Sequence, residues 1–125
     1  MIADNGSLFA VGGPNYMGGQ GVIRVYEEGS LGKYSQVGPD IVGEAGEALG
    51  ARNTFSGDGM TVIAGTANGI AKRFDYDALL DEWVQLYDPI DTGFATVAGV
   101  AATDAGNTFV AAGSSQATIL SLIPI

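Results

Sequence analysis

One short sequence motif occurs three times along this chain: a glycine-containing turn followed by a short apolar run. The copies span Asp4–Gly12, Gly57–Gly65 and Asp104–Gly113. Tight hairpin turns favour glycine, which tolerates positive φ, and Asp or Asn, which bonds to nearby backbone. The structural turn residues of the three copies are Asp4, Gly6, Asp58, Gly59, Asp104 and Gly106. Three copies of one motif predict a repeat protein, in which similar units pack on one another.

The residues around these turns predict short β-strands. Val22–Tyr26 alternates, as a strand does. Gly21–Tyr26 matches Gly69–Phe74 position for position, and Tyr34–Val37 matches Trp83–Leu86 in the same way. Short Val, Ile, Phe and Tyr runs broken by Gly and Asp are typical of an all-β chain. We expect ten strands, at Ser7–Gly12, Val22–Tyr26, Tyr34–Gly38, Ala51–Ser56, Met60–Gly65, Gly69–Phe74, Trp83–Leu86, Thr96–Thr103, Asn107–Ala112 and Ala117–Leu122.

The repeat length favours a β-propeller. The turn glycines Gly6, Gly59 and Gly106 recur about every 50 residues, and a repeat of that length with about four antiparallel strands is typical of one propeller blade. The predicted units are residues 1–49, 50–95 and 96–125, which make roughly two and a half blades. Closed propellers have at least about four blades. We therefore expect one repeat domain that belongs to a larger propeller or closes with a partner. A compact ten-strand β-sandwich or barrel is the alternative.

Charge and composition exclude several classes of function. The chain has 14 acidic and 5 basic residues, a net charge of −9, and no cysteine or histidine. Nucleic-acid binding needs Lys and Arg to neutralise phosphates, so we expect no nucleic-acid partner. The missing residue types exclude disulfides, thiolate metal sites and catalytic systems that depend on histidine.

The first residues and the apolar runs bear on location. Met1–Asp4 leads directly into the first repeat without the basic and apolar segments of a signal peptide. No apolar run has the length of a membrane span, so we expect no membrane insertion. Either the protein stays where it is made, or this chain is part of a longer precursor.

Three segments carry a family resemblance. Asn5–Pro14, Gly21–Tyr26 and Tyr34–Glu44 resemble the FG-GAP repeat of integrin alpha-subunit β-propellers, and in particular the FG-GAP-like or WD-like repeats of large proteins from marine algae and bacteria. The second unit matches more loosely and the third is truncated. The resemblance implies a propeller and an extracellular or secreted location. It implies no particular reaction, because propellers serve many unrelated roles.

Calcium is the candidate cofactor that the resemblance implies. Integrin-type repeats carry an Asp-x-Asp-x-Asp loop, and calcium takes six to eight oxygen ligands. The turns here offer one carboxylate each, at Asp4, Asp58 and Asp104. The acidic segment Asp75–Glu82 departs from the EF-hand pattern, because Leu79 and Leu80 occupy ligand and glycine positions. We therefore expect no bound metal and a solvated turn at this segment.

Catalytic patterns are weak. Asp104–Phe109 resembles the Asp-box of sialidase propellers, which is a structural turn. The carboxylates that could form a glycosidase pair have no spacing that selects two of them, and a glycosidase is only the third hypothesis. The glycine-rich loop Gly12–Gly21 leads into a strand where a phosphate-binding loop would lead into a helix. We expect no catalytic residue, no cofactor and no enzyme activity. The carboxylates in question are Glu44, Glu47, Asp88 and Asp91.

Two pairs of residues are the candidates for packing and recognition. Tyr34 and Trp83 hold the same repeat position and are expected to pack against a neighbouring blade. Tyr16 and Met17 have no counterpart in the second unit and form the candidate interaction loop. The leading hypothesis is a non-catalytic structural or protein-interaction segment, completed by a protein partner or by self-association. The alternative is an extracellular propeller that binds carbohydrate or a cation.

Overall fold

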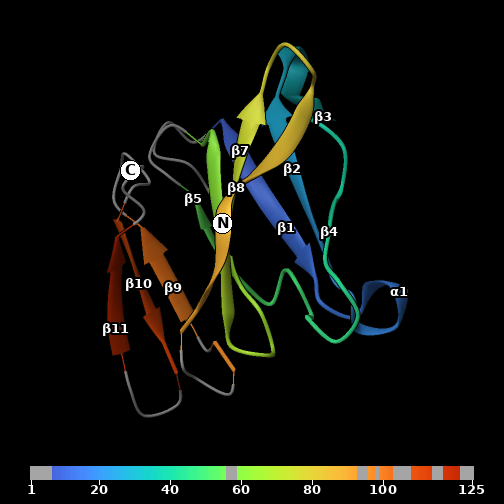
Figure 1. Cartoon of the computed structure of the whole chain (residues 1–125). Coiled ribbons are helices and arrows are strands. Elements are labelled where there is room, and N and C mark those ends of the chain that lie inside the picture. The colour runs from blue at the N-terminus through green and yellow to red at the C-terminus, as the bar shows by residue number, and fades with distance from the viewer. Residues whose placement is uncertain are drawn as a thin grey trace.

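The computed structural model describes residues 7–55, 59–92, 96–97, 99–102, 108–113 and 117–121. These residues form antiparallel β-sheets and almost no helix, which confirms the predicted all-β class (Figure 1). The first sheet contains β1 (Leu8–Gly13), β2 (Val22–Glu28), β3 (Tyr34–Gln36) and β4 (Ile41–Val42). The second contains β5 (Arg52–Phe55), β6 (Thr61–Gly65), β7 (Ile70–Asp77) and β8 (Glu82–Asp91). The third contains β9 (Gly99–Ala102), β10 (Thr108–Ala112) and β11 (Ala117–Ser121).

Each predicted strand has an observed counterpart, and β4 is an addition. The strand β8 is longer than the predicted Trp83–Leu86, and β9 is shorter than the predicted Thr96–Thr103. In the first sheet the chain leaves β3 after Gln36 and returns to pair β4 with the other end of β2. Gly38 has a φ of +70°, and Pro39 follows it, so the backbone cannot continue as one strand. The second sheet has one long strand, β8, at the equivalent place, with a register shift between Ala71 and Arg73 of its partner.

Two short helical turns fall within predicted loops. The turn α1 (Tyr16–Gly19) lies between β1 and β2, and the 3-10 turn η1 (Ser30–Gly32) lies at the tip of the β2–β3 hairpin. Residues inside both turns have left-handed φ, so neither is a regular helix. Within the described residues, no helix is long and apolar enough to span a membrane.

The first two sheets share one pairing register. The pair Phe9–Tyr26 of β1 and β2 corresponds to Val62–Phe74 of β6 and β7. Two residues further along the strands, the pair Val11–Arg24 corresponds to the pair Ala64–Lys72. The remaining equivalent pairs are Tyr26–Gln36 with Phe74–Gln85, Glu28–Tyr34 with Tyr76–Trp83, and Ile23–Ile41 with Ala71–Ile90.

The main hydrophobic core lies between the first and second sheets. The first sheet contributes one face, in which Leu8, Ala10, Ile23 and Val25 are all buried. The second sheet contributes Phe55, Val62, Ala64 and Phe74, with Tyr76 and Trp83 packed at the margin. The two contributing faces are not equivalent, because alternate residues of a strand point to opposite sides. The residue of the first sheet that is equivalent to Val62 is Phe9, and not Leu8 or Ala10.

The third sheet lies beside the opposite face of the second sheet, near the strands β5 and β6 (Figure 1). Gly65 at the end of β6 shows how close this approach is, because a Cβ there would lie 2.3 Å from a methyl group of Val97. The amide of Val97 donates to the carbonyl of Thr66 over 3.1 Å, and the hydroxyl of Thr96 donates to the carbonyl of Ala67 over 2.7 Å. The three sheets therefore follow one another in a row.

The predicted turn residues are only partly within the described structure. Gly59 has a φ of +76°, the conformation for which a turn glycine was predicted. Asp4, Gly6, Asp58, Asp104 and Gly106 lie outside the described residues. The division into residues 1–49, 50–95 and 96–125 stays a prediction.

Candidate interaction surface

The predicted interaction loop lies at one end of the first sheet. Tyr16 is partly exposed, and Met17 is largely exposed with a φ of +53°. That conformation is uncommon for a residue with a side chain and costs about 1–3 kcal/mol. The loop is anchored to the segment before β5, since the amide of Ala48 donates to the carbonyl of Gly19 over 2.8 Å. The role of Tyr16 and Met17 as an interaction loop stays a prediction.

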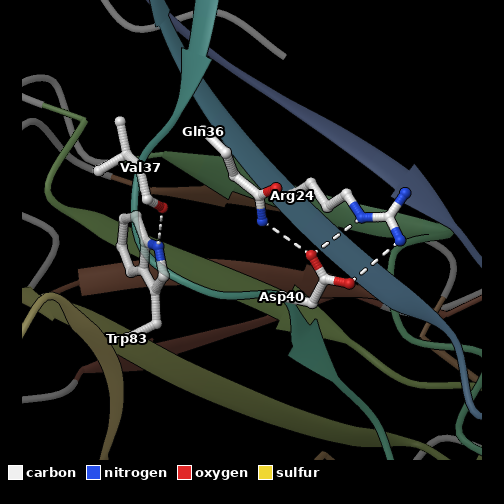
Figure 2. Close-up of polar contacts among 5 residues, drawn as sticks. All are labelled: Arg24, Gln36, Val37, Asp40 and Trp83. Atoms are coloured by element: carbon white, nitrogen blue, oxygen red, sulfur yellow. Dashed lines mark hydrogen bonds and ion pairs between the residues drawn. The ribbon is translucent and has the colours of Figure 1, made fainter.

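An ion-pair network lies near this loop, on β2, β3 and the segment between β3 and β4 (Figure 2). Both nitrogens of the Arg24 fork donate to Asp40, Nε to Oδ1 over 2.9 Å and Nη2 to Oδ2 over 3.0 Å. The amide of Gln36 donates to the same Oδ1 over 2.7 Å. These hydrogen bonds, first that of Arg24 and then that of Gln36, lower the pKa of Asp40, and the Asp40 contact raises the pKa of Arg24.

The guanidinium of Arg24 also joins the network to the loop. Its central carbon lies 5.7 Å from the centre of the Tyr16 ring, which is within the range of a cation–π contact. Arg24 therefore contacts both Asp40 and the ring of Tyr16. The alternation within Val22–Tyr26 is a pattern from which the outward orientation of the Arg24 side chain could have been predicted. No pattern in the sequence indicates its pairing with Asp40.

An aromatic cluster lies on the same side of the first sheet as Arg24. The Phe9 ring stacks on Tyr26 with centroids 5.4 Å apart and meets the edge of Tyr34 at 5.2 Å. We call this side of the first sheet the open face, and its residues are Phe9, Val11, Arg24, Tyr26, Tyr34, Gln36 and Val42. Tyr34 is 55% exposed, and its ring contacts Phe9 of its own sheet. Its expected packing against a neighbouring blade stays a prediction.

Trp83 holds the position of Tyr34 in the second sheet, and its surroundings are different. Its indole Nε1 donates to the backbone carbonyl of Val37 over 2.8 Å, across the interface between the first two sheets (Figure 2). Its ring also lies so close to Gly38 that a Cβ there would come within 2.8 Å of it. Trp83 thus ties the outer strand of the second sheet to the first sheet.

A buried ion pair marks the same interface further along the strands. Lys72 Nζ lies 2.7 Å from Oε2 and 2.8 Å from Oε1 of Glu47, and both side chains are almost wholly removed from solvent. Glu47 Oε1 also accepts from the amide of Glu44 over 2.7 Å. The carboxylate of Glu47, one of the four glycosidase candidates, is therefore fully engaged in a structural contact.

The acidic segment Asp75–Glu82 comprises the end of β7, the β7–β8 turn and the first residue of β8. Asp77 accepts from the amides of Leu79 and Leu80, over 3.0 and 3.3 Å, and both leucines are exposed. The hydroxyl of Tyr76 donates to Asp81, and this hydrogen bond is the main cause that raises the pKa of Tyr76. Within the described residues no group of three or more acidic side chains could hold a metal ion.

Comparison with known proteins adds no assignment. No protein-family model matches this chain. A search of curated proteins finds no similar protein. The resemblance to FG-GAP repeats and the function that it implies stay predictions.

Proposed function

We propose that this chain is a non-catalytic segment of a β-propeller that acts as a structural and protein-interaction module in a larger polypeptide or complex. The three sheets would be successive blades, about two and a half in all. The observation that carries the proposal is the shared register of the first two sheets together with their stacking in the same orientation. Blades of a propeller are repeated antiparallel sheets that each cover a face of the next.

The radial order of the strands supports the same proposal. In a propeller, inner strands approach one another near the axis and outer strands approach one another at the rim. Here β9 lies near β5, the first strand of its sheet, while Trp83 of the last strand β8 reaches Val37, next to β3. A β-sandwich would pair two sheets without this correspondence of strand positions.

The chemistry of the surface favours binding over catalysis. In the part of the chain that the structure describes, every buried side-chain nitrogen or oxygen has a hydrogen-bond partner. Arg24, Lys72 and Arg73 each form an ion pair with a carboxylate. Polar groups that are satisfied within the protein stabilise an arrangement, whereas a catalytic site presents groups to a substrate.

The test is the absolute mass of the purified chain in solution, measured by light scattering after size exclusion, with and without calcium. The proposal predicts association beyond the monomer that calcium does not change. A folded monomer at every concentration would contradict it. Assembly that requires calcium would instead favour a cation-binding propeller.

A further inference from the structure

We propose that Asn68 is a site of spontaneous modification, which converts with time to aspartate and isoaspartate and thereby loosens the contact between the second and third sheets. Asn68 directly precedes Gly69 in the turn between β6 and β7, and it is exposed to solvent. The proposal goes beyond the proposed function, because the modification needs no partner, cofactor or enzyme. It uses only the side chain of Asn68, the backbone of Gly69 and water.

The reaction is an attack of the backbone on the neighbouring side chain. The nitrogen of Gly69 loses its proton and adds to Cγ of Asn68, the new nitrogen–carbon bond closes a cyclic imide, and the side-chain nitrogen takes up a proton and leaves as ammonia. Water then opens the imide. Attack of water at Cγ gives aspartate, whereas attack at the backbone carbonyl carbon gives isoaspartate, in which the main chain runs through Cγ and is longer by one carbon.

The local structure favours this attack. Gly69 has no side chain to hinder the approach, and its amide makes only a long hydrogen bond, 3.3 Å, to the carbonyl of Thr66. The hydroxyl of Thr66 donates to Oδ1 of Asn68, the oxygen on which negative charge gathers as the nitrogen adds. That hydroxyl is held in place, because it accepts from the amide of Ile70 over 3.0 Å and Thr66 is 1% exposed.

The other asparagines in the described part of the chain lack this combination. Asn15 precedes Tyr16, and Asn53 precedes Thr54. A side chain on the following residue hinders the approach of its nitrogen, whereas glycine does not. Asn68 is therefore the asparagine of the described residues that the reaction selects.

The modified position lies in a turn that connects all three sheets. The amide of Ala67 donates to the carbonyl of Glu47 over 2.7 Å, which joins the turn to the segment after the first sheet. The amide of Val97 donates to the carbonyl of Thr66 over 3.1 Å, which joins the turn to the segment before the third sheet. An extra backbone carbon at position 68 displaces the two ends of the turn relative to each other, so isoaspartate weakens these contacts.

The first repeat builds the equivalent junction with glutamine. The residue before the turn glycine is Gln20 there, and Gly21 and Gly69 have φ values of +82° and +83°. Their carbonyls accept from equivalent amides, those of Gly43 over 3.1 Å and Thr92 over 3.0 Å. The side chain of glutamine is longer by one methylene, so the same attack would close a larger ring and is slower. The junction is therefore compatible with a side chain that resists the modification.

The experiment follows the full chain over time in mildly alkaline buffer, until conversion of Asn68 is clear in a parallel sample unfolded in urea. Cleavage after Arg52 and Lys72 releases residues 53–72, and mass spectrometry with fragmentation of this peptide reports Asn68 separately from the sequence pair Asn5–Gly6. Methylation by an isoaspartyl methyltransferase counts isoaspartate. The matched control is Asn68→Gln, the residue of the first repeat. The variant Asn68→Asp, measured fresh, supplies the charge without the longer backbone.

Hydrogen exchange measures the structural consequence at the amides of Thr92 and Val97, which donate to this turn. We expect Asn68 to convert in the folded wild-type chain, faster at higher pH because the attacking nitrogen must lose its proton. The aged chain should lose protection at both amides. The aged Asn68→Gln chain and the fresh Asn68→Asp chain should keep it.

Three results would overturn the proposal. The first is an Asn68 that stays intact in the folded chain while it converts in urea. The second is conversion to isoaspartate with unchanged hydrogen exchange. The third is an equal loss of protection in fresh Asn68→Asp, because the charge and not the longer backbone would then be the cause. None of these readouts depends on association of the chain, so the proposed function is tested separately.

Discussion

The first and second sheets place equivalent side chains at equivalent positions, yet their surroundings differ. In the second sheet Lys72 is buried against Glu47, and Trp83 reaches the carbonyl of Val37. In the first sheet the corresponding Arg24 and Tyr34 are partly exposed, and Arg24 pairs with Asp40 and lies near Tyr16 while Tyr34 contacts Phe9. The difference shows that a repeat defines the shape of a face, while its neighbours decide whether that face becomes a core or a surface.

Polar partners follow the same division. Position 40 is Asp in the first repeat, and its counterpart in the second is Pro89. Arg24 can therefore find its carboxylate within its own repeat, whereas Lys72 takes one from the neighbouring repeat. The partner inside the repeat keeps the cation satisfied where no sheet covers it. The partner from the neighbour connects two sheets.

The largest expected effect comes from breaking the buried ion pair. Glu47→Gln leaves the Lys72 ammonium buried without a counter-charge and should lower the free energy of unfolding by about 3–5 kcal/mol. Urea unfolding followed by the fluorescence of Trp83, the single tryptophan, measures this change.

The double variant Glu47→Leu with Lys72→Met is the control for that prediction. It replaces both charges with apolar groups of similar size, and such replacements are often close to neutral. The double variant should be clearly more stable than Glu47→Gln. If the double variant were less stable than Glu47→Gln, the ion pair would contribute more to the free energy of unfolding than its burial costs. This account of the interface would then be wrong.

An intermediate effect is expected at the two aromatic positions. Trp83→Phe removes the hydrogen bond to the Val37 carbonyl and should cost about 1–3 kcal/mol, because a buried carbonyl is left without its donor. Tyr34→Phe at the equivalent exposed position should leave stability almost unchanged. Circular dichroism during thermal unfolding compares the two variants, and equal losses would contradict the difference between the sheets.

The smallest effect concerns pH and the exposed network. The lowered pKa of Asp40 means that its carboxylate binds a proton less readily in the folded chain than in the unfolded chain. Its contribution is therefore present above the ordinary value near 3.8 and is lost as the pH falls through the lowered folded pKa. The urea midpoint should fall less steeply with acid in Asp40→Asn than in the wild type. Parallel curves would show that the network does not contribute.

Much of this fold can be predicted from the sequence because the relevant signals are local. The match of Gly21–Tyr26 with Gly69–Phe74 predicted two equivalent strands, and both glycines have nearly the same φ, +82° and +83°. At Gly21 a side chain would also collide with the backbone of Leu49, at 2.1 Å. Position and turn chemistry here are properties of short segments, and a sequence pattern records them.

The rest depends on which segments meet across the sheets, and this is not a local property. Glu47 and Lys72 are 25 residues apart, and neither has a neighbour in sequence that indicates the pairing. The alternation in β2 predicted a strand, but nothing in it indicates that Arg24 pairs with Asp40. The hydrogen bond from the Ala48 amide to the Gly19 carbonyl, which anchors α1, is likewise a contact between separate segments.

The most direct test moves the single tryptophan between the two equivalent positions. The native chain carries it at Trp83, and the variant Tyr34→Trp with Trp83→Phe carries it on the open face. We predict that acrylamide quenches the variant much more strongly at low concentration. Trp83 in the native chain should be quenched weakly at all concentrations. Equal quenching of the two proteins at low concentration would contradict the central claim that equivalent faces are covered in one sheet and open in the other.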